Sequence, residues 1–127
     1  MTKVTIITVL VLDQDAAIAF YTNTLGFELV EDRPFGESRW VTVALPNQRE
    51  LTLALELATT AEDKAHVGRQ AGGHAFLGLD TSDCAADYRR MKPLGVKFLG
   101  EPQSGPWGTG VQLEDLYGNK QFLSQHP

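Results

Sequence analysis

The pattern of apolar and polar residues predicts a series of strands with one helix, and the series then repeats. Residues 3–12 are rich in Val, Ile and Thr, a composition that favours a strand. Asp13 or Asp15 can cap the helix that follows through its carboxylate. Apolar residues then recur at helical spacing up to Leu25, and Gly26 supplies the left-handed stop. Three more strands complete the first half, at 27–31, 40–45 and 51–57, with turns at 33–36 and 46–47.

A polar segment, residues 58–71, follows this series and looks like a linker with room for one helical turn. A strand at 74–79 then leads to a helix that is capped within 81–83 and ends at 94–95. The remaining elements are a strand at 96–100, a turn at 101–102, a glycine-rich loop at 104–110 and two strands that flank a turn at 115–119. The order is therefore βαβββ twice, with a period of about 68 residues.

This order predicts an α+β fold built from two βαβββ modules. One helix covers only one face of the strands in each module, so the other face needs a second cover. Pairing the modules, so that their strands form a curled mixed sheet around a shared cavity, provides that cover and leaves the helices outside. We therefore expect a single domain, 1–127, with module one at 1–57, the linker at 58–71 and module two at 72–127.

Composition limits the class of protein. The 43% apolar and 21% charged residues are those of an ordinary globular domain. Cys84 is the only cysteine, which excludes an intramolecular disulfide, and its place on the inner side of the second helix predicts a packing role. The formal charge of −5 argues against nucleic-acid binding, and no apolar run approaches the length of a membrane span. We expect a cytoplasmic protein with neither of these partners.

The two halves differ at one position that matters for chemistry. When Leu79-Asp80 is aligned with the Val11-Leu12-Asp13 end of the first strand, His74 falls opposite Ile6. One half therefore carries a side chain that can bind a metal or donate a hydrogen bond, where the other half carries an inert one.

Five segments carry a resemblance to a known family: Val11-Leu12-Asp13-Gln14-Asp15, Ala19-Phe20-Tyr21-Thr22-Asn23-Thr24-Leu25-Gly26-Phe27, Gly73-His74-Ala75-Phe76, Pro106-Trp107-Gly108-Thr109 and Glu114-Asp115-Leu116-Tyr117-Gly118-Asn119. Together they resemble the vicinal oxygen chelate superfamily, which includes glyoxalase I, bleomycin-resistance proteins and extradiol dioxygenases. The resemblance covers essentially the whole chain. It implies the paired βαβββ fold, and it is weaker evidence for any one activity because the fold supports many chemistries.

Active members of this superfamily place four metal ligands on cavity-facing strand positions, two in each module, and these are usually His, Gln or Glu. The resemblance implies that the four positions are Ile6, Glu56, His74 and Phe122 in this chain. Ile6 and Phe122 cannot coordinate a metal, and Gln121 points to the opposite face of the last strand unless a bulge shifts it. Because catalytic sites usually need three protein ligands, we expect no metal cofactor, with His74 and Glu56 as the ligands if one binds.

An apolar cavity with a few polar groups is the remaining candidate site. Trp107 is the most informative residue, because it lies in the glycine-rich loop, where a core role is less natural and the ring could close over a ligand. Phe76 and Ile6 fit simple filling of the interior equally well. The candidate ligand-pocket residues are Ile6, Thr8, Trp40, Glu56, His74, Phe76, Trp107 and Phe122.

Three functions fit these residues, and the sequence leaves open whether the protein is an enzyme. The leading interpretation is a metal-independent protein that binds a small, partly aromatic molecule, and the resemblance implies that it forms a homodimer. The second is a glyoxalase-like isomerase or lyase, or a dioxygenase, that uses a metal on His74 and Glu56; a metal-free variant would use Glu56 as a catalytic base. The third is an accessory interaction module that has kept the fold and lost the site.

Overall fold

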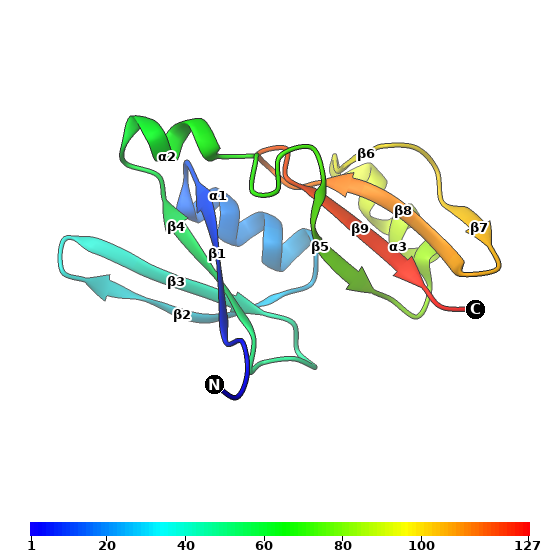
Figure 1. Ribbon diagram of the computed structural model, residues 1–127, viewed down its shortest axis with the longest axis horizontal. Helices are drawn as coiled ribbons and strands as arrows, with labels where there is room; N and C mark the ends of the chain where they lie inside the picture. Colours follow the sequence, from blue (N-terminus) through cyan, green and yellow to red (C-terminus); the bar gives the residue numbers. More distant parts are fainter. The chain divides into compact units, whose positions relative to one another are not determined.

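The computed structural model describes residues 1–127, and the chain divides into two compact units, Met1–Val67 and Gly68–Pro127 (Figure 1). The division falls inside the polar segment 58–71 that the sequence marks as a linker. Each unit contains one sheet, and the two are described separately. No helix in either unit is both long enough and apolar enough to cross a membrane.

The first unit follows the βαβββ order and ends in an additional short helix. Its elements are β1 (Ile6–Val11), α1 (Gln14–Ala19) with a π-helical extension (Phe20–Thr24), β2 (Glu28–Phe35), β3 (Ser38–Ala44), β4 (Thr52–Leu57) and α2 (Ala61–His66). The strand order is β1-β4-β3-β2; β1 runs parallel to β4, and the other neighbours are antiparallel. Parallel pairing of β1 and β4 places the first and last strands of the module side by side at one end of the sheet.

The second unit repeats this plan with one extra short strand. Its elements are β5 (Ala75–Asp80), α3 (Cys84–Met91) with a 3-10 extension (Lys92–Leu94), β6 (Lys97–Phe98), β7 (Gln103–Gly105), β8 (Gly108–Glu114) and β9 (Lys120–Gln125). The strand order is β5-β9-β8-β6, and β7 also pairs with β8. Here β5 is parallel to β9, as β1 is to β4. The prediction of an α+β fold with two βαβββ modules is confirmed.

Local signals start and stop both helices as the sequence predicts. The Asp13 carboxylate accepts a hydrogen bond from the backbone N–H of Ala16, and Asp83 caps α3 in the same way through Ala86. Gly26 and Gly95 both adopt positive φ angles where the helical segments end. Cys84 is fully buried, as expected for a packing role, and desolvation together with Asp87 and Asp83 raises the pKa of its thiol.

One face of each sheet is buried and forms the core. In the first unit, Val9, Val43 and Leu55 are almost completely inaccessible. Gln14 joins α1 to this face, because its side-chain Nε2 donates to the backbone carbonyl of Leu55 at 2.8 Å. In the second unit α3 contacts β8 and β9, where Leu113 is buried. Each helix therefore covers one face of its own sheet.

Two predicted irregular segments belong to strands in the structure. The segment 33–36 was expected to be a turn, but Arg33, Pro34 and Phe35 extend β2, and the turn follows at Gly36. Proline is tolerated there because β2 is an edge strand, where one side of the backbone has no partner strand. The expected loop 104–110 is instead a tight hairpin between β7 and β8.

A buried turn connects β8 to β9. The Asp115 carboxylate accepts hydrogen bonds from the backbone N–H groups of Tyr117 and Asn119 and from the Asn119 side chain, each at 2.9 Å. The side-chain Oδ1 of Asn119, in turn, accepts a hydrogen bond from the backbone N–H of Gln70 at 2.9 Å. The turn therefore joins the β8–β9 hairpin to the segment around Gln70, at the start of the second unit.

We expect Asn119→Ala to lower the free energy of unfolding by about 2–3 kcal/mol, because it leaves buried hydrogen-bonding groups of Asp115 and Gln70 without their Asn119 partners. Urea denaturation followed by circular dichroism measures this change. Asn47→Ala, in an exposed turn of the first unit, is the matched control and should change stability by less than about 0.5 kcal/mol. Equal losses in the two variants would contradict a structural role for the buried turn.

Candidate functional site

The face of each sheet opposite its helix remains open. In the first unit the register pairs Ile6 with Thr52, Thr8 with Ala54, and Leu10 with Glu56. Partners in a ladder share a face, and this set is offset by one residue from the buried Val9 and Leu55. Ile6 is 47% exposed. Ile6, Thr8 and Glu56 therefore lie on the open face, as their assignment to a ligand pocket requires.

Trp40 is fixed on the same open face by a side-chain hydrogen bond. Its indole Nε1 donates to the Glu31 carboxylate at 3.0 Å, and its ring lies 6.4 Å from that of Phe35. The hydrogen bond to Trp40 lowers the pKa of Glu31, with a smaller contribution from Arg33. The indole N–H of Trp40 is thus already occupied inside the unit.

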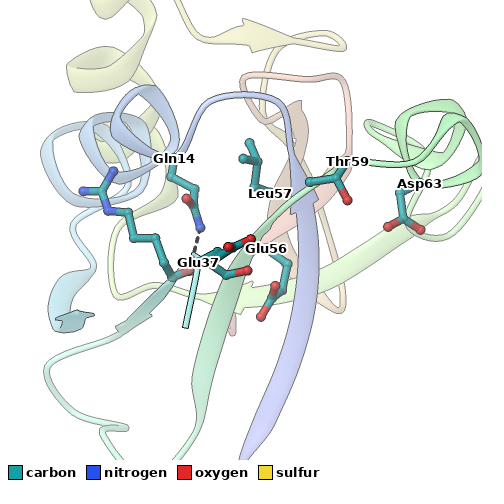
Figure 2. A pocket seen from close by; sticks show the side chains of 8 residues that line it. Gln14, Glu37, Glu56, Leu57, Thr59 and Asp63 are labelled. Atoms are coloured by element: carbon teal, nitrogen blue, oxygen red, sulfur yellow. Dashed lines mark hydrogen bonds between the residues drawn. The ribbon is translucent and has the colours of Figure 1, made fainter. Parts of the chain in front are cut away.

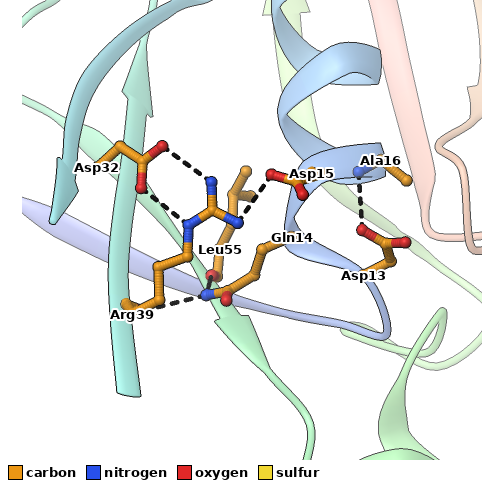
Figure 3. Close-up of polar contacts among 7 residues, drawn as sticks. All are labelled: Asp13, Gln14, Asp15, Ala16, Asp32, Arg39 and Leu55. Carbon is orange, nitrogen blue, oxygen red and sulfur yellow. Dashed lines mark hydrogen bonds and ion pairs between the residues drawn. The ribbon is translucent and has the colours of Figure 1, made fainter. Parts of the chain in front are cut away.

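Arg39 lies at the centre of an ion-pair cluster that the sequence did not predict (Figure 3). Its guanidinium contacts Asp15 at 2.8 Å and binds both carboxylate oxygens of Asp32, at 2.8 and 2.9 Å. The hydrogen bond from Arg39 lowers the pKa of Asp32, and the two carboxylates raise the pKa of Arg39. Gln14 donates to the backbone carbonyl of Arg39 at 3.1 Å, so the cluster ties α1 to β2 and β3.

A pocket of about 410 Å³ lies beside this cluster (Figure 2). Its lining residues are Gln14, Glu37, Ser38, Arg39, Glu56, Leu57, Thr59 and Asp63. The three carboxylates, Glu37, Glu56 and Asp63, form no ion pair, whereas the one cation, Arg39, is paired with Asp15 and Asp32. The lining therefore carries an uncompensated negative charge, which attracts cations and repels anions.

In the second unit, the continuous register of β8 and β9 determines which face each residue occupies. Gln121 pairs with Leu113 and is completely buried, whereas Phe122 pairs with Gln112 on the opposite face. The register shows no bulge at this point. Phe122, and not Gln121, therefore faces the open side of the sheet, as predicted.

Trp107 lies at the tip of the β7–β8 hairpin and packs against Phe122. The two ring centroids are 6.1 Å apart with the planes inclined at 43°, and 51% of Trp107 remains exposed. Both rings line a pocket of about 230 Å³, together with Leu99, Glu101, Gln103, Gly110, Val111 and Gln112. The structure thus brings Trp107 and Phe122 together at one apolar wall with a polar rim.

The two units keep the pseudo-symmetry that the sequence predicts. Leu10 pairs with Glu56 in the first unit, and Gly78 pairs with Phe122 in the second. Ile6 lies four residues before Leu10, and His74 lies four residues before Gly78, so Ile6 and His74 occupy equivalent positions in the repeat. His74 lies in an exposed turn just before β5, where its backbone N–H donates to Ala71. Phe76 follows on β5, half-buried at a register shift.

Within each unit, the two positions that the resemblance implies for metal ligands hold only one side chain that can coordinate a metal ion. The first unit contributes Ile6 and Glu56, and the second contributes His74 and Phe122, so each unit has one possible ligand and one hydrocarbon side chain. Ile6 faces Thr52 in the ladder and lies four residues from the strand position opposite Glu56. A carboxylate and an imidazole supply fewer than the three protein ligands that catalytic sites usually require.

Sequence reasoning missed the Arg39 cluster for an identifiable reason. Asp32 and Arg39 meet because β2 and β3 pair across a turn at Gly36-Glu37. Placing the turn at 33–36 removes this pairing, and Asp15 reaches Arg39 only once α1 packs on the sheet. The one available signal was the pair of opposite charges on either side of a glycine turn.

Comparison with known families agrees with the fold. A model of the Glyoxalase/Bleomycin resistance protein/Dioxygenase superfamily matches residues 3–121, and the chain belongs to this superfamily. A protein of Shewanella frigidimarina (strain NCIMB 400), itself described as uncharacterized, is 44% identical over 94% of this chain and 90% of its own length.

Two solved structures show the same fold at substantial identity. UcmS2 is 34% identical, covers 98% of both chains and superposes with a TM-score of 0.85. TnmS3 of Streptomyces sp. CB03234, described as an antibiotic binding protein, is 31% identical, covers 100% of this chain and 98% of its own, and has a TM-score of 0.82.

We expect Trp40→Phe to raise the pKa of Glu31 toward its ordinary value, because the indole hydrogen bond is the largest cause of its depression. Carboxyl carbon chemical shifts in an NMR titration measure this directly. In the wild type, the lowered pKa stabilises the fold above the ordinary Glu pKa, and this contribution is lost as the pH falls through the folded value. Asp32, whose pKa depends on Arg39, is the internal control and should not change.

Proposed function

We propose that this protein binds a small, partly aromatic organic molecule and does so without a metal ion. The observation that carries the proposal is the half-exposed indole of Trp107, which packs against Phe122 and lines a pocket. Apolar walls with a few polar groups at the rim are typical of small-molecule sites, and aromatic faces bind flat rings by stacking. An exposed tryptophan at a hairpin tip adds nothing to the core, so a role in binding accounts for it better than packing.

The relatives support this class of function. TnmS3 is described as an antibiotic binding protein, and its structure matches this chain over its whole length. By analogy, we propose that the ligand belongs to the antibiotics or to similar small molecules, and the paired rings of Trp107 and Phe122 favour one with a planar aromatic part.

Metal independence is proposed from the donor set. Ile6 and Phe122 have no lone pair to offer, which leaves Glu56 and His74 as the candidates at the four positions. A glyoxalase-like isomerase or lyase needs a Lewis acid or an equivalent group to stabilise the charge that develops on a substrate oxygen. The sequestration of a ligand requires no such group, and it is therefore the function that these residues support best.

We expect the tryptophan fluorescence of the wild-type protein to be quenched on titration with doxorubicin or with 9-aminoacridine, two flat aromatic probes. We expect Trp107→Ala to weaken the binding of these probes by about tenfold. The reason is that an aromatic contact contributes roughly 0.5–1.5 kcal/mol beyond its buried area, and 1.4 kcal/mol corresponds to a factor of ten. Isothermal titration calorimetry measures both variants without depending on the tryptophan signal.

Leu94→Ala is the matched control for this experiment, since it removes another exposed apolar side chain at the end of the second helical segment. It should bind the probes as the wild type does. Saturable binding that survives Trp107→Ala would place the site elsewhere. An absence of binding by both flat probes would contradict the proposed function.

We expect untagged protein, incubated with Zn, Ni, Mn and Fe(II) and then desalted, to retain a substoichiometric amount of metal. Elemental analysis measures this, and probe binding should persist in His74→Ala and Glu56→Gln, because neither residue is needed to complete a metal shell. A stoichiometric metal that disappears in His74→Ala would contradict the proposal. Assays of isomerase and dioxygenase activity would then take precedence.

A further inference from the structure

The hairpin that carries Trp107 is rich in glycine, and the structure requires glycine at these positions for different reasons. Gly108 needs its residue type for the backbone, because it has φ +126° and an added Cβ would lie 2.0 Å from the carbonyl oxygen of Gln125. Gly105 and Gly110 do not have positive φ angles, so any residue could adopt their backbone conformation. Their lack of a side chain must be explained by the space around them.

That space is filled by the two aromatic rings. An added Cβ at Gly105 would lie 2.7 Å from Trp107 Nε1 and 3.1 Å from its Cδ1. An added Cβ at Gly110 would lie 2.6 Å from Phe122 Cζ, 3.1 Å from Trp107 Cη2 and 3.1 Å from the backbone carbonyl oxygen of Leu123. Real Cβ contacts are almost never this close, so a methyl group at either position would displace a ring. The glycines therefore provide the surface on which the aromatic wall rests.

We propose that Gly105 and Gly110 are specificity-determining residues, which set the position of the Trp107 and Phe122 rings so that the pocket accepts a flat aromatic ring system. This inference rests on the proposed ligand binding and adds the shape that the site selects. The pocket volume of about 230 Å³ is below the roughly 300–1,000 Å³ of sites that enclose a whole drug-sized molecule. It therefore holds one part of the ligand, and the remainder extends beyond it.

The polar rim adds a chemical preference to this shape. Glu101 is the only charged residue in the lining, and Gln103 and Gln112 contribute amides. The Gln103 side chain donates to the backbone carbonyl of Glu101 at 3.2 Å, and no ion pair neutralises the Glu101 carboxylate. A ring system with an amine or another hydrogen-bond donor on the edge that faces Glu101 matches this rim, because a carboxylate only accepts hydrogen bonds.

A matched pair of probes tests the shape. 9-Aminoacridine has three flat fused rings, and tacrine carries the same amine on the same framework with one ring saturated and puckered. We expect wild-type protein to bind 9-aminoacridine more tightly than tacrine by calorimetry. Gly110→Ala should weaken 9-aminoacridine binding by about tenfold and reduce the discrimination between the two probes, since the new methyl group moves both rings. Glu101→Gln should weaken both probes similarly.

Two further variants control for folding and for non-specific effects. Gly105→Ala displaces only Trp107 and should give a smaller loss of the same kind, which keeps the inference testable if Gly110→Ala does not fold. Gly73→Ala adds a methyl group in the same unit where nothing lies within 4 Å, and it should bind both probes as the wild type does. Thermal unfolding of each variant confirms that affinities are compared between folded proteins.

The outcomes separate this inference from the proposed function. If Trp107→Ala weakens binding but Gly105→Ala and Gly110→Ala retain wild-type affinity and discrimination, the role of the glycines is overturned and the proposed function stands. If the wild type binds tacrine as tightly as 9-aminoacridine, the preference for flat rings is overturned. If neither probe binds saturably, both the inference and the proposed function fail.

Discussion

The constraint on which this structure depends is that each sheet has one helix to cover it. Side chains alternate between the two faces of a strand, so every strand presents half of its residues to the face without a helix. In the first unit Val9 and Leu55 are buried on the helix side, while Ile6, on the other face, is 47% exposed. The open faces are therefore the places where residues are free to serve binding and not packing. Of the candidate site residues on strands, Ile6, Thr8, Trp40, Glu56 and Phe122 are found there.

The pseudo-symmetric repeat shows how the site has diverged between the two units. At one pair of equivalent positions the first unit has Ile6 and the second has His74. At the other pair the first unit has Glu56 and the second has Phe122. Each unit therefore has one polar side chain and one hydrocarbon side chain at these positions, in opposite order. As a result, neither unit has two donors of its own. The two hydrocarbon side chains add apolar surface to the open faces, which weakens the case for metal chemistry and strengthens the case for an apolar ligand.

The fold could be predicted because its signals are local. Aspartate caps, glycine stops and apolar periodicity each act within a few residues, and Asp13, Gly26, Asp83 and Gly95 all behave as expected. The errors arise where tertiary pairing overrides a local preference. Pro34 was interpreted as a turn residue, but an edge strand accommodates it, and the glycines of 104–110 belong to a hairpin whose spacing is set by aromatic rings.

The site was predictable in its residue types and less so in its geometry. The glycine-rich surroundings of Trp107 suggest that its ring could close over a ligand, and the family resemblance implies that Phe122 lies at a cavity-facing position. The contact between the two rings depends on cross-strand pairing of β7, β8 and β9, which no local pattern encodes. The same holds for Arg39 on β3, whose ion-pair partners Asp15 and Asp32 come from two other elements, α1 and β2.

The two tryptophans differ in a way that bears on which one serves a ligand. The Trp40 N–H donates to Glu31, so its ring is held in place, and a ligand that competed for this N–H would have to break a hydrogen bond to a carboxylate. Trp107 is half exposed, and no side-chain hydrogen bond within the chain occupies its N–H. Its position is determined instead by packing against Phe122 and the glycines. A ring that is positioned by shape but retains its hydrogen-bonding capacity is preorganised for a ligand, because binding requires no internal bond to be broken.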